Sequence, residues 1–505
     1  MLSRRSLFRA GGGLALAATA LADSTSWNAS AATSQWNILR SRLQGTLVLP
    51  TDSGFAAAKQ LQLGQYDAVN PQAVAYCQNA DDVRTCVLFS QYTGTPLRVR
   101  SGGHNLAGWS TGDNALIVDL SRINQATVTG STVQLGPGTQ SIDALSQLKP
   151  YNKQVIAGTC PTVCAGGFLS GGGLGWQTRK FGIGADHVVS ARVATSDGRI
   201  TYCSPFVEPD LYWAVRGGGG GNFGIVVNFE VTPIDAPVLT AYETVWSFDN
   251  AATTIAAWEH WTANAPRELG SSLIVVPPNG YYGYPSSNPL VRIYGGYHGV
   301  QADADAQLDQ LALAVGAKPL SRTSQQFGFA DGMQYLYGCG DITELACHRA
   351  GSNPDAVLPR TPNQRQSYRL IDRQLTTADA TDVLNAWSAH PELPYRFLQS
   401  FALGGAANDV PSGATAYVHR SAQSLLGYQV GFQDSTDVPA ADDWAAAGAA
   451  ALAPRAGGSY INFPSSVMNG DWAADNYGDN YARLVQVKYA YDPTDLFQHP
   501  QSVGS

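Results

Sequence analysis

The sequence has few charged residues and no block of basic ones. Only 14% of its 505 residues are charged, and 31 Lys and Arg against 39 Asp and Glu give a net charge of −8. Proteins that neutralise many phosphates carry clustered Lys and Arg, so no nucleic-acid partner is expected. Beyond the N-terminal segment, no apolar run is long enough to span a bilayer. With 44% hydrophobic residues the chain is too apolar for disorder, and its length favours two domains.

The first 22 residues have the composition of an export signal. Arg4, Arg5 and Arg9 precede a mildly apolar run, no acidic residue occurs, and Ala20-Leu21-Ala22 has the form of a cleavage site. The run is too short and too rich in glycine for a membrane anchor. The segment resembles a twin-arginine signal, which exports proteins already folded. We therefore expect residues 1–22 to be removed and the mature protein to be periplasmic or secreted, without membrane attachment.

The seven cysteines are an odd number, so an exported chain leaves at least one thiol without a partner. Cys339 and Cys347 are close in sequence across a glycine-containing stretch and are candidates for a disulfide. Cys77 with Cys86 is a second candidate, although sequence alone does not give the geometry.

The pattern of expected helices and strands differs between two parts of the chain. Residues 66–233 mix strands and helices without βα repetition, which indicates an α+β arrangement. From about residue 234, aromatic-rich strands such as 291–297 alternate with alanine-rich helices such as 302–315, which favours a second domain with an antiparallel sheet backed by helices. Residues 476–502 differ again from both.

The first of three glycine motifs is Arg98-Val-Arg-Ser-Gly-Gly-His104-Asn105. A strand that ends in Ser-Gly-Gly leaves backbone N–H groups free to bind phosphate oxygens. His104 follows at once, where the ring of a cofactor can lie. The alternative is an ordinary turn at a strand end with a surface histidine.

The second motif places Cys160 and Cys164 among many glycines, in Ala157-Gly-Thr-Cys-Pro-Thr-Val-Cys-Ala-Gly-Gly-Phe-Leu-Ser-Gly-Gly-Gly-Leu-Gly175. Backbone this bare suits a flat ligand, and an accessible thiolate can attack an electrophilic ring. The alternative is a flexible loop with buried structural thiols.

The third motif is Asp210-Leu-Tyr-Trp-Ala-Val-Arg-Gly-Gly-Gly-Gly-Gly-Asn-Phe-Gly224. Its glycines match the G-x-G-x-x-G pattern of dinucleotide-binding domains. They run into the strand expected at 225–231 and not into a helix, so no helix N-terminus meets a pyrophosphate. A Rossmann domain is therefore excluded.

The C-terminal segment completes a recognisable set. It contains Asn476-Tyr-Gly-Asp-Asn-Tyr-Ala-Arg483 and then Tyr491-Asp-Pro493. With the three glycine motifs in the same order, it resembles the berberine bridge enzyme-like family within the vanillyl-alcohol oxidase fold. The resemblance implies an α+β, two-domain protein: an FAD-binding domain over residues 36–233, a substrate-binding domain with an antiparallel sheet over 234–464, and a segment over 465–505 that returns to the first domain.

The resemblance also implies an FAD held by two covalent bonds. His104 matches the histidine that bonds the flavin 8α-methyl group, and Cys160 matches the cysteine that bonds flavin C6. Cys164 stands where members usually have glycine and is interpreted as an extra small residue. Val163 matches a position beside the flavin where valine tends to admit oxygen, which favours an oxidase. No metal is implied. The other expected FAD-binding residues are Arg100, Ser101, Gly102, Gly103, Asn105, Gly158, Thr159, Gly166, Gly167, Gly171, Gly224, Ile225, Asn476, Tyr477 and Asn480.

The usual catalytic base of the family is missing. Many members have a tyrosine in an Asn-Tyr-Pro segment, but here Phe463 lies between Asn462 and Pro464 and cannot take a proton. A second tyrosine of some members is also replaced, by Phe401. The expected substrate-facing residues are Gln429 and Gln399. A displaced tyrosine is expected to supply the base, with Tyr417 or Tyr428 ahead of Tyr294 and Tyr297.

The implied reaction is hydride transfer from a carbon bearing a hydroxyl group to flavin N5, followed by reoxidation by oxygen to hydrogen peroxide. A sugar hemiacetal or another alcohol is the first choice of substrate. A tailoring oxidase for an aromatic or polycyclic metabolite is the second, and a secreted flavin-binding protein with little turnover is the third. The expected partners are a small-molecule substrate and oxygen, and the protein is expected to be a monomer.

Overall fold

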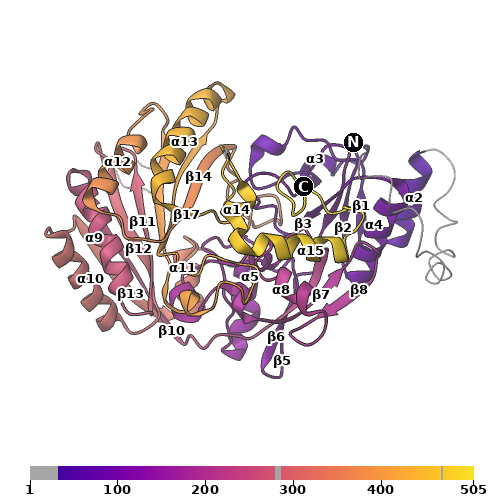
Figure 1. Cartoon of the computed structure of the whole chain (residues 1–505), viewed down its shortest axis with the longest axis horizontal. Helices are drawn as coiled ribbons and strands as arrows, with labels where there is room; N and C mark the ends of the chain where they lie inside the picture. The colour runs from indigo at the N-terminus through magenta and orange to yellow at the C-terminus, as the bar shows by residue number, and fades with distance from the viewer. Residues whose placement is uncertain (1–31, 279–285, 468–469) are drawn as a thin grey trace.

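The structure is a computed structural model that describes residues 32–278, 286–467 and 470–505 (Figure 1). The expected signal segment lies outside the described residues. Three sheets are present: two are built from residues 46–231, and the third from residues 238–458. The expected α+β architecture is confirmed. The domain boundaries at 233 and 464 stay predictions, although the sheets divide the chain near the first of them.

The two smaller sheets carry the glycine motifs. In the four-stranded sheet, β2 (Ala73–Tyr76) and β3 (Leu97–Arg100) run parallel to the central β4 (Leu116–Asp119), and β1 (Thr46–Val48) pairs with β2. The five-stranded sheet is antiparallel. Its order is β5 (Ala126–Thr129), β6 (Thr132–Leu135), β9 (Ile225–Val231), β7 (Val188–Ala194) and β8 (Ile200–Cys203).

Helix α4 (Ala80–Thr93) shows how local signals set the boundaries of an element. The Asn79 side chain accepts a hydrogen bond from the Asp82 N–H at 3.0 Å and caps the N-terminus. Gly94 ends the helix at φ 71°, a left-handed conformation that favours glycine.

The third sheet has eight antiparallel strands. Their order is β13 (Ser321–Gly328), β10 (Val238–Ser247), β12 (Leu290–Tyr297), β11 (Leu269–Val276), β15 (Tyr395–Ala402), β16 (Ser424–Phe432), β14 (Asn363–Ile371) and β17 (Ala456–Gly458). Figure 1 shows α9 (Ala251–Asn264), α10 (Gln301–Val315), α12 (Thr377–Trp387) and α13 (Val438–Leu452) on its outer side. Trp246, Trp258, Trp387 and Trp444 are buried there in one cluster. The helices therefore cover one face of the sheet and leave the other for a site.

The C-terminal segment packs onto the third glycine motif. Helix α15 (Tyr481–Tyr491) packs against α8 (Pro209–Ala214), and α14 (Trp472–Tyr477) packs against α15 and β17; Figure 1 shows α14 and α15 in yellow. The Tyr477 hydroxyl donates to the Gly218 carbonyl at 3.0 Å, and the Val503 N–H donates to Asn222 Oδ1 at 3.0 Å. The C-terminal segment thus stabilises the third glycine motif through these hydrogen bonds.

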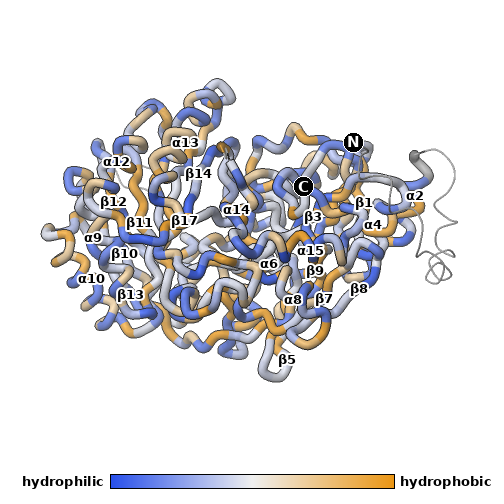
Figure 2. The backbone as a smooth tube through the Cα atoms, viewed as in Figure 1, coloured by the Kyte–Doolittle hydropathy of each residue, from blue (hydrophilic) through white to orange (hydrophobic). Residues whose placement is uncertain are grey.

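The remaining elements are short. They are the helices α2 (Ala32–Arg42), α3 (Phe55–Ala58), α5 (Ser141–Leu148), α6 (Ala165–Ser170), α7 (Thr178–Phe181) and α11 (Phe329–Leu336), and the 3₁₀ helices Gly64–Tyr66, Lys149–Tyr151, Gly184–His187, Phe248–Asn250, Gly405–Asp409, Ser435–Asp437, Ala453–Arg455 and Gly478–Asn480. Apolar residues are interleaved with polar ones along the described chain (Figure 2). Within the described ranges, no helix combines the length and the apolar character needed to cross a bilayer.

One of the two expected disulfides is present. Cys339 and Cys347 are bonded, which confirms that candidate. Cys77 and Cys86 are buried with their sulfurs 4.0 Å apart and are not bonded, so the second candidate is corrected. That separation is a van der Waals contact, and a bond would require the sulfurs to approach to about 2.05 Å.

Candidate active site

A cavity of about 1290 Å³ lies between the glycine motifs and the uncovered face of the eight-stranded sheet. Its walls include parts of all three glycine motifs on one side. On the other side are side chains from β10, β12, β13, β15 and β16. Both candidate linkage residues, His104 and Cys160, line it.

The first motif forms a turn directly after β3. The backbone N–H groups of Gly102 and Gly103 make no hydrogen bond to any described residue, so they remain available to an anionic ligand. A Cβ at Gly102 would lie 2.8 Å from Cys164 Sγ, so this turn needs glycine to pack against the second motif.

His104 is held as a neutral imidazole. Its Nε2 lies 2.8 Å from Thr162 Oγ1. Burial and the nearby Arg349 cation lower the pKa of His104 to about 4, against a weaker opposite effect of its hydrogen bonding at Thr162. Because Thr162 engages Nε2, the nitrogen left for another bond is Nδ1.

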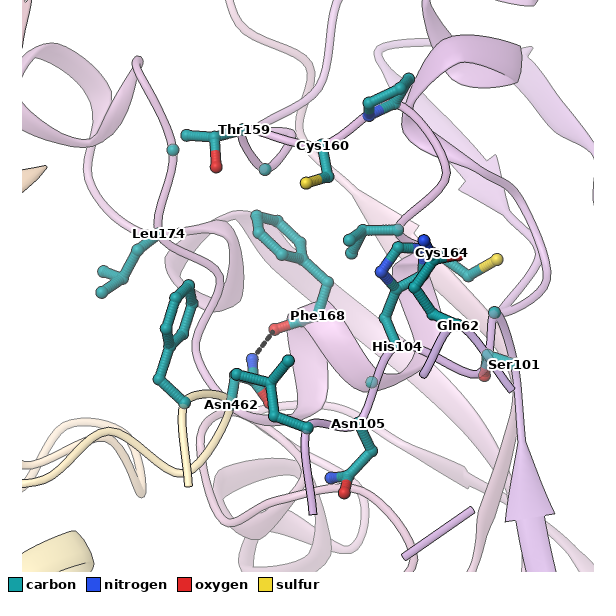
Figure 3. Close-up of a pocket in the computed structure, with 18 of the residues that line it drawn as sticks. Gln62, Ser101, His104, Asn105, Thr159, Cys160, Cys164, Phe168, Leu174 and Asn462 are labelled. Atoms are coloured by element: carbon teal, nitrogen blue, oxygen red, sulfur yellow. Dashed lines mark hydrogen bonds between the residues drawn. The ribbon is translucent and has the colours of Figure 1, made fainter. Parts of the chain in front are cut away.

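Cys160 presents its thiol to the cavity. Its side chain is exposed to the interior space while the surrounding protein raises the pKa of the thiol. Figure 3 shows Cys160 and His104 at the same space, beside Phe168, and shows the Cys164 sulfur pointing elsewhere. Cys164 is buried, and its Sγ donates to the Gly138 carbonyl at 3.2 Å.

The second and third motifs line the cavity with glycine backbone that carries no side chains. A Cβ at Gly167 would meet no atom within 4 Å, and one at Gly220 would come no closer than 3.8 Å to any neighbour. Both glycines line the cavity, so side chains there would fill space that a ligand can use. Free N–H groups, a bare cleft and two reactive side chains together fit a dinucleotide cofactor with an electrophilic ring system, as in FAD.

The opposite wall is polar at its centre and aromatic at its edge. Gln399 and Gln429 line it from the neighbouring strands β15 and β16. Glu243 of β10 forms an ion pair with Arg292 of β12. The aromatic edge consists of Trp176, Phe401 and Phe463.

Comparison with known proteins identifies this arrangement. A family model described as "FAD binding domain" matches residues 71–204, and one described as "Berberine and berberine like" matches residues 459–504. The chain belongs to the berberine bridge enzyme-like family of FAD-linked oxidoreductases. The resemblance expected from the motifs is thus confirmed, and FAD is the cofactor of this berberine bridge enzyme-like protein.

Its relatives include oxidases of carbohydrates. It is 29% identical to a chitooligosaccharide oxidase of Gibberella zeae over 86% of this chain and 87% of the relative. It is 28% identical to a xylooligosaccharide oxidase of Thermothelomyces thermophilus, with the same two coverages. The solved berberine bridge enzyme of Eschscholzia californica shares the fold with a TM-score of 0.81 at 20% identity, over 93% of this chain and 98% of that one.

The structure brings most expected cofactor residues of this berberine bridge enzyme-like chain to the cavity. The lining includes Ser101, Gly102, Gly103, His104, Asn105, Gly158, Thr159, Cys160, Val163, Gly166, Gly167, Gly224 and Ile225.

Five expected cofactor residues lie outside the cavity lining, and their role in binding FAD stays a prediction. Arg100 forms an ion pair with Asp119 and donates to the Ala58 carbonyl, so it braces β3. A Cβ at Gly171 would lie 2.2 Å from Asn462 Oδ1, so this glycine allows close packing. Asn476, Tyr477 and Asn480 form hydrogen bonds that anchor the C-terminal segment to the rest of the protein.

Neither of the two tyrosines expected first as the base lines the cavity. Tyr428 points to the helix-covered face, where its hydroxyl donates to the Val383 carbonyl at 2.7 Å, because neighbouring residues of a strand face opposite sides and Gln429 faces the cavity. Tyr417 is buried between Tyr460 and His419 and does not line the cavity. Among the other two candidates, Tyr294 lines the cavity and Tyr297 does not.

Sequence reasoning missed the partners of the two glutamines. The Tyr368 hydroxyl of β14 lies 3.1 Å from Gln399 Oε1 and 3.3 Å from Gln429 Oε1. The Glu243–Arg292 pair was missed as well. Each of these contacts depends on the pairing of strands that are far apart in sequence, and a local sequence pattern does not predict such pairing.

Proposed function

We propose that the protein is an FAD-linked oxidase that acts on a carbon bearing a hydroxyl group, with a sugar hemiacetal as its substrate class. The observation that carries the proposal is the single cavity that joins His104 and Cys160 to a polar wall on the antiparallel sheet. Bound FAD supplies the acceptor for the substrate hydride and, after reduction, the reaction with oxygen that yields hydrogen peroxide.

We also propose that His104 and Cys160 both bond the flavin. Support comes from the neutral imidazole of His104, whose Nδ1 is left over by the contact of Nε2 with Thr162. The thiol of Cys160 is exposed to the same cavity. Two anchors on separate loops fix a ring in place and leave the opposite wall open for bulky substrates.

The polar wall suits a sugar. A hydroxyl group both donates and accepts hydrogen bonds, and this wall offers both functions through two amides and an ion pair: Gln399, Gln429, Glu243 and Arg292. The names of the chitooligosaccharide and xylooligosaccharide oxidases, aligned over most of this chain, agree with such a substrate.

Oxygen is the proposed electron acceptor because Val163, three residues after Cys160, lines the cavity. A branched side chain of this size leaves more space over a ring edge than a longer one would.

A second candidate is oxidation of an aromatic alcohol or polycyclic metabolite. The observation in its favour is the aromatic edge of the cavity, where Phe401 and Phe463 lie with ring centroids 6.2 Å apart and Trp176 is 6.5 Å from Phe401. Aromatic rings pack well at these separations, so this edge can hold a flat apolar substrate.

The test is anaerobic bleaching of the flavin absorbance against a panel of mono- and oligosaccharides and hydroxylated aromatics, followed by admission of oxygen and a peroxide assay. Bleaching by a sugar with recovery and peroxide supports the proposal. Bleaching only by aromatics selects the second candidate, and reduction without recovery in oxygen makes the protein a dehydrogenase.

Export through the twin-arginine route is also proposed. The Cys339–Cys347 disulfide supports it, because such bonds form and persist in oxidising compartments. Mass spectrometry of protein recovered outside the cytoplasm should give a chain that begins at Asp23, and replacement of Arg4 and Arg5 by Lys should keep the protein inside.

A further inference from the structure

The proposed oxidation requires a residue that accepts the hydroxyl proton, and the family's usual tyrosine position holds Phe463. The cavity wall carries other ionisable groups that could accept this proton. Several already have partners within the described part of the chain: the Tyr242 hydroxyl donates to the Gly270 carbonyl at 2.9 Å, and Glu243 is paired with Arg292. His499 stacks on Trp109, and its Nδ1 accepts from the Gln501 N–H at 3.3 Å.

Tyr294 has a different environment. Its hydroxyl oxygen accepts a hydrogen bond from Gln399 Nε2 at 3.5 Å. The Arg292 guanidinium lies 5.4 Å from the centre of its ring. An amide donor and a cation both favour the phenolate form of a tyrosine, although burial opposes them and leaves the pKa of Tyr294 raised.

A hydrogen bond from Tyr368 orients the side-chain amide of Gln399. The Tyr368 hydroxyl has one proton and two glutamine acceptors, of which Gln399 Oε1 at 3.1 Å is nearer than Gln429 Oε1 at 3.3 Å. With its oxygen engaged in this way, the Gln399 amide must present its N–H₂ group to Tyr294. In this arrangement Tyr294 accepts a hydrogen bond from Gln399.

The strand next to Tyr368 is shaped to allow this contact. Gly427 of β16 lies opposite Tyr368 in the ladder, and a Cβ there would be 2.1 Å from Tyr368 Cδ1. The tyrosine ring thus lies across a gap in β16 that only glycine provides, which lets its hydroxyl reach β15.

Tyr294 also lines the same cavity as Cys160. The ring atom proposed to bond Cys160 is flavin C6, and C6 and the hydride-accepting N5 are attached to the same ring carbon. A phenol in the cavity that Cys160 lines can therefore approach the site of hydride transfer.

We propose that Tyr294 is the catalytic residue that accepts the substrate hydroxyl proton, and that Tyr368 and Gln399 are the positioning residues that hold it as a phenolate acceptor. This inference rests on the proposed function. The substrate O–H bond breaks with its proton passing to the Tyr294 oxygen, the C–H bond breaks with its electron pair passing as hydride to oxidised FAD, and the carbon–oxygen bond becomes a carbonyl.

Tyr460 is the competing phenol on the same wall. Its hydroxyl oxygen accepts from the Gly173 N–H at 2.8 Å and from Asn462 Nδ2 at 3.0 Å, but burial raises its pKa to about 12 and no cation lies over its ring among the described residues. It is therefore the matched comparison in the test.

The experiment uses flavin-loaded Tyr294→Phe, Tyr368→Phe, Gln399→Leu and Tyr460→Phe with a substrate found in the bleaching panel. Tyr294→Phe should slow flavin reduction by about 10²–10⁴-fold, remove the alkaline limb of its pH profile, and leave the affinity for the lactone product within a few-fold. Tyr368→Phe and Gln399→Leu should move that limb to higher pH, because the phenolate loses stabilisation. If Tyr460→Phe removes the limb and Tyr294→Phe does not, the proposal is overturned.

A second measurement needs no substrate and therefore separates this inference from the proposed function. Near-ultraviolet titration of each holoenzyme, with the Tyr294→Phe spectrum subtracted, reports the ionisation of Tyr294 alone. Tyr368→Phe, Gln399→Leu and Gly427→Ala should each raise its midpoint, while Tyr460→Phe should not. Unchanged midpoints in all three would disprove the positioning chain even if no sugar reduced the flavin.

Discussion

The hydroxyl of Tyr337 donates a hydrogen bond to the carbonyl of Gly158, 3.1 Å away. Tyr337 precedes the disulfide-closed loop from Cys339 to Cys347, and Gly158 precedes Cys160 by two residues. The loop is fastened further by His348, whose Nε2 lies 2.9 Å from Asp143 Oδ1. A segment that follows β13 in the chain therefore positions the cysteine of the second glycine motif.

Loss of this contact should affect one linkage more than the other. Tyr337→Phe removes about 1 kcal/mol of hydrogen bonding at Gly158, which should lower the rate of flavin attachment at Cys160 roughly fivefold while attachment at His104 is maintained. The measurement is mass spectrometry of flavin-bearing peptides over time. Tyr335→Phe, at an exposed neighbour, is the control and should change neither.

The double linkage gives a prediction of its own. His104→Ala and Cys160→Ala should each keep the flavin attached in acid-denatured protein, because the other bond remains, and only the double variant should release it. Cys203→Ala, which removes a buried thiol elsewhere, is the control. Release by either single change would show that one bond is absent, and retention in the double variant would point to Cys164.

Reoxidation should depend on the side chain at position 163. Rapid mixing of reduced protein with oxygen should restore the flavin spectrum quickly in the unaltered protein and more slowly in Val163→Leu, because the longer side chain fills space in the cavity. Val163→Ala should not be slower than the unaltered protein. Slow reoxidation in all three would argue for another electron acceptor.

Glu259 predicts a pH dependence of stability. Burial raises the pKa of this carboxyl to about 7, against weaker lowering by hydrogen bonds from Ser424 and Ser400. The folded state therefore binds a proton that the unfolded chain releases near pH 4.5. The contribution of Glu259 to the free energy of unfolding is therefore fully present below pH 4.5. It is lost as the pH rises to 7, by an amount on the order of 3 kcal/mol.

Glu259→Gln should remove that loss, because the amide carries no charge to bury. The melting temperature of the flavin-loaded variant should vary less between pH 4.5 and 7, and it should exceed that of the unaltered protein above pH 7. Glu268→Gln, at a partly exposed carboxylate, is the control. A parallel decline in both would assign the effect to other groups.

The sequence predicted the cofactor half better than the substrate half for a physical reason. Glycines, His104 and Cys160 act through backbone conformation and reactive atoms within short segments, so their meaning is local. The substrate wall is assembled from strands between β10 and β16, whose order in the sheet differs from their order in the chain. Which residues meet there depends on register, and register is not readable from one strand.

Tyr428 shows the size of that effect. The choice between Tyr428 and Gln429 is a single position, yet it moves a side chain from the helix-covered face to the cavity. Tyr368 was missed for a related reason: its importance lies in Gly427 on the neighbouring strand and in two glutamines, none of which is near it in sequence.

The stabilisation of the third glycine motif by the C-terminal segment has a consequence for how the protein is made. Val503 lies 281 residues after Asn222, and Tyr477 lies 259 residues after Gly218. A nascent chain can emerge with every glycine of the cofactor cleft already synthesised and still lack the contacts that hold the third motif in shape. Flavin capture therefore becomes an event that follows translation through residue 503, so a newly made pool of protein should pass through a colourless, protease-sensitive stage before it turns yellow.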